Sequence, residues 1–296
     1  MRGTRPSARS ARPGPGAGPR PVRRPPESHP LGSGHERRQA LRPGHGRLQR
    51  YRPRTGEAAR RAEHDLIVNA EDEARLERAI RQIREAGTAV HTVPADLRFP
   101  GRTEALYAAV TATGRPLDVA VLNAGVGRGG AFVDNHLADE LEVVDLNVRS
   151  TVHLAKPVLR DMAARDAGRV LVTSSVASTT PGSYQAVYNA SKSFLQALRN
   201  EFEDTGITLT SLMPGPTDTD LLQRAGMDDT PVCRQDKDDP AQVARQGPDA
   251  LFAGRDKLTA GSARTKAQGL AGKVLPDRLK AEAHRRMAEP DSGEGG

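Results

Sequence analysis

Apolar positions follow two alternating patterns from residue 65 onward, short apolar runs and longer stretches with helical spacing. The run Asp65–Ala70 (DLIVNA) is typical of a buried strand. In the next segment, Leu76, Ile80 and Ile83 share one face of an amphipathic helix, which Gly87 is expected to end. Strands that alternate with helices of this length predict an α/β protein, in which helices cover both faces of a doubly wound, mainly parallel sheet.

The other expected elements continue this order along the chain. Further strands are predicted at residues 88–96, 117–125, 168–175 and 207–215, and further helices at 102–114, 134–165 (one helix or two), 183–206 and 239–254. A short segment near residues 257–261 and a charged helical tail follow. Ligands of such sheets bind at the carboxyl ends of the strands, so functional side chains are expected there.

The first 60 residues differ in composition from the rest of the chain. Fifteen Arg, ten Pro and nine Gly fill 34 of these positions, with three Glu and no Lys or Asp. This segment carries a formal charge of +12 and the whole chain +7, so the remainder carries −5. Such a segment cannot bury enough apolar surface to offset the entropic cost of ordering. We therefore expect a disordered basic leader over residues 1–63 and a folded domain over residues 64–296.

The composition disfavours several classes of protein. The single cysteine, Cys233, rules out an internal disulfide and suits a reducing compartment, so a cytoplasmic protein is expected. No apolar run approaches the ~20 residues that span a bilayer, and no apolar stretch typical of a signal peptide follows the N-terminus. The eight His show no metal-ligand spacing with the cysteine, and 3% aromatic residues disfavour base stacking. We expect no metal, nucleic acid or membrane as partner.

Candidate acid–base chemistry lies in the sequence YNASK. Tyr188 and Lys192 are one helical turn apart and share a helix face. A phenol titrates near ~10, and a neighbouring ammonium is expected to lower that pKa by favouring the phenolate. Tyr188 is then suited to exchange a proton while a hydride moves. Ser175, at the end of an expected strand, is suited to donate a hydrogen bond to the substrate oxygen.

Each of these signals also has an ordinary structural explanation. A Tyr and a Lys four residues apart often occur together by chance. Serines at a strand end commonly form caps or turns, and Asn147, inside an expected helix, is of a type that commonly bonds backbone. The sequence NAG at residues 123–125 is compatible with a simple turn. The order and spacing of all these features together are what indicate a catalytic site.

Residues 65–220 resemble the short-chain dehydrogenase/reductase family through motifs that occur in the family's order. The motifs are Asp96, NAG at 123–125, Asn147, SS at 174–175, YNASK at 188–192 and PGPTDT at 214–219. The resemblance implies a Rossmann fold and an enzyme that transfers a hydride between NAD or NADP and a small-molecule carbonyl or secondary alcohol. It also implies a homodimer or homotetramer.

The resemblance further implies roles for individual residues. The catalytic tetrad would be Asn147, Ser175, Tyr188 and Lys192, with Tyr188 as general acid/base. Tyr188 and Lys192 would also contact the cofactor, Lys192 at the ribose hydroxyls beside the nicotinamide. The other cofactor contacts would come from Asp96 at the adenine, from Asn123, Ala124 and Gly125 along the cleft, and from Pro214, Gly215 and Thr217 at the carboxamide.

One family motif is missing, the glycine-rich loop after the first strand. Glycines of that loop let the backbone approach the pyrophosphate at a helix N-terminus. Its expected place holds GHGRLQRYRP, residues 44–53. Read one base later, permitted codons for these residues give V-T-G-A-S-S-G-I-G, the family fingerprint. The second base of each printed codon becomes the first base of a shifted codon, and all nine are compatible.

We therefore expect residues up to about Arg60 to be an out-of-frame reading of a dehydrogenase start. The alternative is a natural Arg-rich arm, and a gene without the shifted fingerprint would favour it. The chain as printed is then expected to lack a normal first strand and the phosphate-binding loop. Weak cofactor binding and poor solubility would follow, because a gap in a parallel sheet exposes strand edges and apolar surface.

The choice between NAD and NADP depends on the end of the second strand. NAD-binding members carry an acid there, against the ribose 2′-hydroxyl, whereas NADP-binding members place Arg nearby. Ala70 stands at the usual position of the acid, which favours NADP. Glu71 and Asp72 follow, and they would repel a phosphate. The balance favours NAD. In the expected substrate loop, about Asp218 to Asp239, the leucines and a methionine indicate an apolar contact.

Two other functions remain open from the sequence. Without the phosphate loop, the chain is compatible with a catalytically silent Rossmann scaffold. The Arg-rich leader is also compatible with a binder of nucleic acid or another anionic surface. Tyr51 is the only aromatic residue of the leader, so the leader lacks the aromatic residues between basic ones that would stack on bases.

Overall fold

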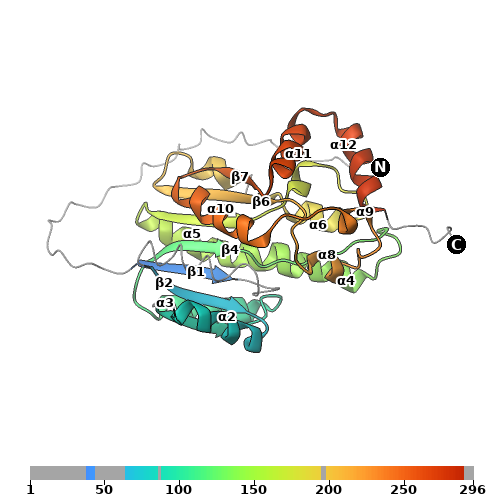
Figure 1. The fold of residues 1–296 in the computed structure, drawn as a ribbon. Coiled ribbons are helices and arrows are strands. Elements are labelled where there is room, and N and C mark those ends of the chain that lie inside the picture. The colour runs from blue at the N-terminus through green and yellow to red at the C-terminus, as the bar shows by residue number, and fades with distance from the viewer. Residues whose placement is uncertain (1–37, 44–63, 86–87, 195–197, 290–296) are drawn as a thin grey trace, which may run out of the picture. The chain divides into compact units, whose positions relative to one another are not determined.

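The computed structural model describes residues 38–43, 64–85, 88–194 and 198–289. In these residues seven strands form one sheet in the order β3-β2-β1-β4-β5-β6-β7, and all neighbours are parallel (Figure 1). The strands are β1 (Arg38–Pro43), β2 (His64–Ala70), β3 (Val90–Pro94), β4 (Leu117–Leu122), β5 (Gly168–Thr173), β6 (Ile207–Pro214) and β7 (Lys257–Ala260). This is the expected parallel α/β fold.

Helices connect the strands and follow the last of them, β7. They are α2 (Glu73–Glu85), α3 (Pro100–Thr111), α4 (Leu137–Val143), α5 (Ser150–Ala164), α6 (Ala186–Ser191), α8 (Leu221–Arg224), α9 (Pro231–Arg234), α10 (Pro240–Phe252), α11 (Ala263–Val274) and α12 (Asp277–Ala288). The π-helical turn η1 (Val144–Arg149) joins α4 to α5, and η2 (Val176–Thr179) and η3 (Arg199–Phe202) are 3₁₀ turns. Local signals mark some helix starts: Asp239 caps α10 through a bond from the Ala241 amide at 2.9 Å.

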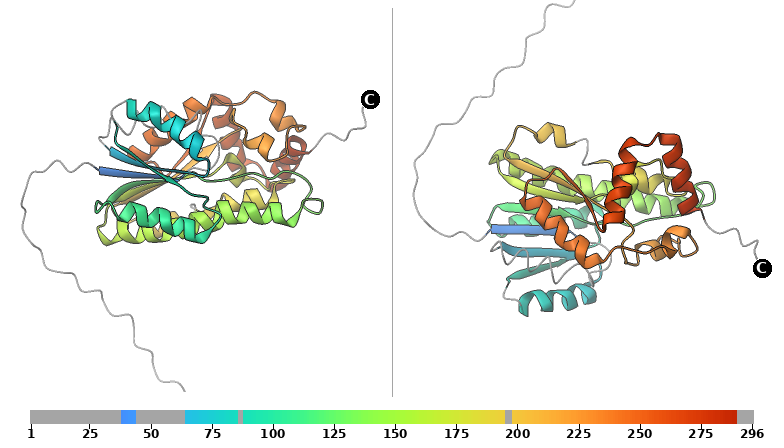
Figure 2. Two further views of the ribbon diagram at one scale, coloured as in Figure 1. Left: turned by 90° about the horizontal axis from the view of Figure 1, so that it is seen from below. Right: turned by 45° about the horizontal axis from the view of Figure 1, so that its top comes forward.

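The sheet lies between two helical layers. Helices α2 and α10 cover one face, and α3 and α5 cover the other (Figure 2). The apolar spacing seen in the sequence supplies the first layer, since Leu76, Ile80 and Ile83 of α2 are buried against the sheet. On the other face Leu106 and Leu154 belong to a second core cluster. Burial on both faces explains why the strands read as continuous apolar runs.

The centre of the sheet is held by β1, which the sequence did not predict. We expected a gap, because residues up to about Arg60 were interpreted as an out-of-frame, disordered leader. The structure instead pairs its backbone with β2, from Arg38 opposite His64 to Pro43 opposite Asn69, and with β4. Backbone hydrogen bonds do not depend on side-chain identity, and without β1 two strands would leave unpaired groups inside the sheet. The expected gap is corrected accordingly. The rest of the expected leader, residues 1–37 and 44–63, lies outside the described residues.

The continuous helix expected over residues 183–206 is interrupted. The structure has α6 and the η3 turn in this range, and residues 195–197 between them lie outside the described part of the chain. Helix α6 ends at Lys192, whose backbone (φ −93°, ψ 3°) leaves the helical region. The Ser191 hydroxyl donates to the Tyr188 carbonyl at 2.7 Å. Such side-chain bonds to the backbone compete with a helix, and apolar spacing does not reveal them.

Candidate active site

The predicted site residues lie at one edge of the sheet, where the parallel strands end. Asn123–Gly125 follow β4, Ser175 follows β5, and the segment 214–217 ends and follows β6. The strand order reverses between β1 and β4, the kind of switch point at which such sheets bind ligands. Helix α6 carries Tyr188, and Lys192 caps its end. The fold thus brings residues from four segments of the sequence to one place.

Tyr188 and Ser175 are in direct contact. The Ser175 side chain forms a hydrogen bond with the Tyr188 phenol. Ser175 has an extended backbone and caps η2, where its Oγ accepts from the Ala177 amide at 3.1 Å. This cap fixes the hydroxyl that touches the phenol. The structural explanation of Ser175 as a cap is therefore correct, and the same side chain also meets Tyr188.

The charge state of Tyr188 differs from the expected one. Burial raises the pKa of the Tyr188 phenol, and the Ser175 hydrogen bond offsets only part of that rise. The expected lowering by Lys192 is absent, although its Nζ lies 5.3 Å from the centre of the Tyr188 ring. Burial also lowers the pKa of Lys192 to about 8, because it disfavours the ammonium as well. In the described structure the phenol is therefore protonated at neutral pH, a state suited to donating a proton.

Lys192 reaches from the end of α6 to the end of β5. Its Nζ donates to the Thr173 carbonyl at 3.4 Å, and its own carbonyl accepts from the Ser174 hydroxyl at 2.6 Å. A side chain at position 125 would place its Cβ 3.1 Å from Lys192 Nζ. The absence of a side chain at Gly125 therefore leaves space for the ammonium. The bond to Thr173 is long, and an ammonium has three N–H donors. Lys192 can therefore also donate to the hydroxyls of a ligand. This donor set fits the ribose of a nicotinamide dinucleotide.

Asn147 lies in the π-helical turn η1 and is 5% exposed. Its side-chain Oδ1 accepts from the Val126 amide and its Nδ2 donates to the Val126 carbonyl, both at 2.8 Å. Nδ2 also donates to Ser191 Oγ at 3.0 Å. Asn147 therefore joins the loop after β4 to helix α6. π-Helical turns often occur at functional sites, but the sequence carried no signal for this one or for the role of Ser191.

The loop after β6 is held by Asp238, which sequence reasoning missed. The Asp238 carboxylate accepts from the Ser262 amide at 2.9 Å and from the Thr265 hydroxyl at 2.6 Å. Burial alone raises the pKa of this carboxyl, but these bonds outweigh it and the pKa lies below its usual value. The Asp238 backbone also pairs with Pro216 and Asp218. Asp238 thereby fixes the segment that holds Pro214, Gly215 and Thr217.

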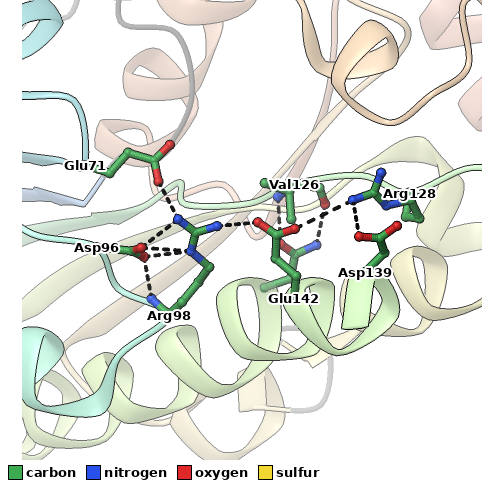
Figure 3. Close-up of polar contacts among 8 residues, drawn as sticks. Glu71, Asp96, Arg98, Val126, Arg128, Asp139 and Glu142 are labelled. Atoms are coloured by element: carbon green, nitrogen blue, oxygen red, sulfur yellow. Dashed lines mark hydrogen bonds and ion pairs between the residues drawn. The ribbon is translucent and has the colours of Figure 1, made fainter. Parts of the chain in front are cut away.

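A band of charged residues continues along the same edge (Figure 3). Asp96 was expected to meet the adenine, and in the structure its carboxylate accepts three bonds from the Arg98 guanidinium, at 2.6–2.9 Å. Arg98 also bonds Glu71 and Glu142. Sequence reasoning singled out Asp96 and Glu71 but not Arg98. Its partner on α4 is 44 residues away, and no spacing rule connects the two.

The expected substrate loop closes over the segment that follows Gly125. The Gly129 amide donates to the Ala225 carbonyl at 2.8 Å, and Met227 lies against Gly129. Ala225 and Met227 form a small apolar cluster with Leu222 and Tyr184, as the apolar residues of this loop indicated. Cys233 is partly exposed, with Lys237 Nζ 3.6 Å from its sulfur. It lies outside the group around Tyr188.

Two features are absent from the described residues, a membrane-spanning helix and a metal-binding cluster. No helix among them is both long enough and apolar enough to cross a bilayer. No group of three or more His, Cys, Asp or Glu side chains in the same residues could hold a metal ion.

The sequence profile of a family described as short chain dehydrogenase matches residues 55–230, more than half of the chain. The chain therefore belongs to the short chain dehydrogenase family. The match begins at residue 55, inside the segment that sequence analysis assigned to the leader.

Curated relatives align over the same region. The "Putative ketoacyl reductase" of Streptomyces coelicolor is 35% identical over 164 residues, 53% of this chain and 62% of that protein. The "Ketoacyl reductase HetN" of Nostoc sp. is 28% identical over 144 residues, 47% of this chain and 50% of that protein. The chain thus spans less than two thirds of the length of these relatives.

Solved structures share the fold. A short chain dehydrogenase/reductase from Burkholderia phymatum in complex with NAD has a TM-score of 0.69 at 21% identity, covering 83% of this chain and 96% of that one. A short-chain dehydrogenase from Sphingobium yanoikuyae in complex with NADPH has a TM-score of 0.66 at 23% identity, covering 80% and 96%. At these identities the similarity describes the architecture alone.

Proposed function

We propose that this protein is a nicotinamide-dependent oxidoreductase that interconverts a carbonyl and an alcohol, with Tyr188 as its acid/base. The observation that carries the proposal is the contact of a protonated, buried Tyr188 phenol with Ser175, beside the Lys192 ammonium. Family membership and the location at the carboxyl edge of the sheet support it. The named relatives are ketoacyl reductases, so ketoacyl compounds belong in the first substrate panel.

Each residue of this group has a chemical task in the proposal. A bound dihydronicotinamide would supply the hydride to the carbonyl carbon. Tyr188 donates its proton to the carbonyl oxygen, and Ser175 donates a hydrogen bond to the same oxygen as charge develops there. Lys192 donates hydrogen bonds to ribose hydroxyls. Asn147 holds the loop after β4 against α6 and so keeps the site assembled.

The test is loss of NADH-dependent carbonyl reduction in Tyr188→Phe. Removing the proton donor is expected to lower kcat about 10²–10⁴-fold, the usual contribution of general acid catalysis. Tyr107→Phe is the matched control. The Tyr107 phenol, on α3, donates a hydrogen bond to Asp161 of α5 and is not part of the proposed site. Equal rates for Tyr188→Phe and the parent protein would favour the silent scaffold.

We propose NAD rather than NADP as the cofactor. Glu71 follows the last residue of β2, and its carboxylate lies in a band with Asp96 and Glu142. The three carboxylates share the single positive charge of Arg98. Their excess negative charge would repel a 2′-phosphate. The solved relatives named above include one complex with NAD and one with NADPH, and they leave this choice to experiment.

We propose that residues 44–52 are an out-of-frame reading of the glycine-rich loop. The shifted codons give the family fingerprint there, and the strand β1 ends at Pro43, immediately before that position. The family match starts at residue 55, before the end near Arg60 that was expected for the out-of-frame segment. Sequencing the gene tests this directly, and a nucleotide sequence that cannot encode V-T-G-A-S-S-G-I-G in the shifted frame would exclude it.

We propose that the protein self-associates as a homodimer or homotetramer. Apolar side chains in the turn before α4 and at its first residue are exposed, with Phe132 at 62%, Val133 at 87% and Leu137 at 71%. Exposed apolar groups that lie close together commonly mark an association surface. Analytical ultracentrifugation tests the assembly, and a monomer at all concentrations would contradict it.

A further inference from the structure

Helix α6, which carries Tyr188, is short and begins without a side-chain cap. It has six residues, and Gln185 at its N-cap position makes no capping hydrogen bond through its side chain. A helix of this length is not stable by itself, so contacts with other elements must hold it. Tyr188 lies in its first turn. The position of the phenol therefore depends on whatever fixes the segment before the helix.

The segment before α6 contains a strained residue. Tyr184 has a φ of 61°, in the left-handed region that residues other than glycine rarely adopt. Such a conformation persists only where the surrounding structure holds it. The segment also packs directly on α6, since a Cβ at Gly182 would lie 1.3 Å from Asn189 Nδ2. The surroundings of residues 182–185 thus decide where α6 begins.

Helix α12 gives this segment its first fixed contact through His284, which is 8% exposed. The imidazole forms a hydrogen bond with the backbone of Ser183. Burial lowers the pKa of His284 and this bond opposes the shift, as expected of a ring N–H that donates to a carbonyl. Nδ1 is buried and has no hydrogen-bond partner among the residues that the structure describes. The bond to Ser183 therefore orients the ring.

A second contact from α12 holds the strained residue itself. The Tyr184 phenol donates to Glu289 Oε1 at 2.8 Å, directly after the end of α12. Arg285, one turn earlier, lies 3.5 Å from the same carboxylate oxygen and keeps it in place. His284 and Glu289 thus hold two consecutive residues, 183 and 184, immediately before α6 begins.

Helix α12 also connects this segment to the substrate loop. Ala288 of α12 and Met227 of the loop are both buried, and Tyr184 packs against the cluster that they form. Gln185 Nε2 contacts Met227 Sδ at 3.0 Å. Figure 1 shows α12 at the end of the molecule that carries α6 and α9. The family profile ends at residue 230, so α12 lies outside the part of the chain that the profile describes.

We propose that His284 and Glu289 are positioning residues, which hold the start of α6 so that the Tyr188 phenol meets Ser175. The effect on catalysis rests on the proposed function, in which Tyr188 gives the proton. The other end of α6 is fixed separately, through Ser191 and the Lys192 carbonyl. Loss of the α12 contacts is therefore expected to displace the first turn, with Tyr188, more than the last turn, with Lys192.

Hydrogen exchange of the full chain, followed by mass spectrometry, measures how firmly α12 holds residues 183–192. In His284→Leu and in Tyr184→Phe, each of which removes one bond, exchange over these residues is expected to rise about fivefold, the value of one hydrogen bond. His284→Gln keeps an N–H donor of similar reach and is expected to restore most of the protection. Glu282→Gln is the control, because it removes an exposed ion pair with Arg286 on the same helix.

Steady-state carbonyl reduction with NADH measures the catalytic consequence. His284→Leu is expected to lower kcat about tenfold, because the rate of proton transfer falls steeply when the donor is displaced. The KM for NADH is expected to stay at the parental value, since Lys192 lies at the end of α6 that keeps its contacts. Thermal melts correct each rate for the folded fraction, and His284→Gln is expected to recover kcat.

The possible results separate the two proposals. Parental exchange over residues 183–192 in both variants overturns the inference, as does faster exchange that is uniform along the chain or that His284→Gln does not reverse. Faster local exchange with parental kcat also overturns it, because Tyr188 would then not depend on α12. A parent protein that reduces no carbonyl overturns the oxidoreductase proposal, and the exchange data then decide alone whether α12 holds the start of α6.

Discussion

Tyr188 and Lys192 are neighbouring side chains whose charged forms are both disfavoured by burial. The pKa of the Tyr188 phenol is raised and that of the Lys192 ammonium is lowered to about 8. The phenol is consequently protonated at neutral pH. This state suits the direction in which Tyr188 gives a proton, the reduction of a carbonyl.

Lys192 is expected to make stability depend on pH. The unfolded chain holds this proton up to the ordinary pKa of 10.5, whereas the folded chain releases it near 8. Between these values the unfolded state binds more protons, so the contribution of Lys192 becomes more favourable as pH rises. Lys192→Met removes this dependence. The variant is therefore expected to exceed the parent protein in free energy of unfolding, by most near pH 7 and by progressively less up to pH 10.5.

Urea unfolding of both proteins at several pH values measures this difference. Lys156→Met is the control, since that side chain lies on the exposed surface of α5. A difference in the free energy of unfolding that stays constant from pH 7 to 10.5 would show that Lys192 is not desolvated as described.

Some residues of the proposed site were predicted from the sequence and others were not. Tyr188, Lys192 and Ser175 could be proposed because the tasks expected of them require particular residue types at local spacings. Asp238 and Arg98 could not, because they act through partners 27 and 44 residues away. The pKa of Tyr188 was also mispredicted, since the sequence showed the neighbouring ammonium but not the burial of both groups.

At the scale of elements, the π-helical turn η1 connects the site. It carries Asn147, whose side chain satisfies both backbone groups of Val126 and touches Ser191 of α6. Asn147→Ala leaves these buried groups without their partner. We expect a loss of about 1–3 kcal/mol in the free energy of unfolding, the cost of unsatisfied buried polar groups.

The proposed role of Asn147 goes beyond stability. The ratio of activity to folded fraction is also expected to fall, because the loop after β4 and the helix of Tyr188 lose their connection. Asn135→Ala is the matched control, since it removes a single bond to Glu140. A variant of Asn147 with full activity and parental stability would contradict this assignment.

The apolar pattern of the sequence was enough to predict some helices and strands but not others. The strands β2 to β6 and the helices α2, α3 and α10 were predicted, because their burial produces a regular apolar pattern. The break at the end of α6 was missed, since a serine-to-backbone bond leaves that pattern unchanged. Strand β1 was missed for a related reason: its pairing uses backbone groups, and its side-chain sequence gives no strand signal.

At the scale of the whole molecule, the sheet is complete across its centre, while the glycine-rich sequence is absent from the printed chain. Replacing residues 44–52 by V-T-G-A-S-S-G-I-G is expected to tighten NADH binding at least about tenfold, because backbone amides at a helix N-terminus then reach the pyrophosphate. Fluorescence titration of NADH with both chains measures the change. Equal affinities would show that residues 44–52 do not occupy the position of that loop.

Hydride transfer itself can be followed with NADH deuterated at the transferable position of the nicotinamide. The repaired chain and the printed chain are each incubated with a panel of ketones and ketoacyl compounds, and the products are analysed by mass spectrometry. We expect both chains to form an alcohol with one deuterium on its carbinol carbon, the printed chain more slowly, and neither chain to form it detectably after Tyr188→Phe. No deuterated alcohol from either chain, or undiminished formation by the Tyr188→Phe variants, would contradict this expectation.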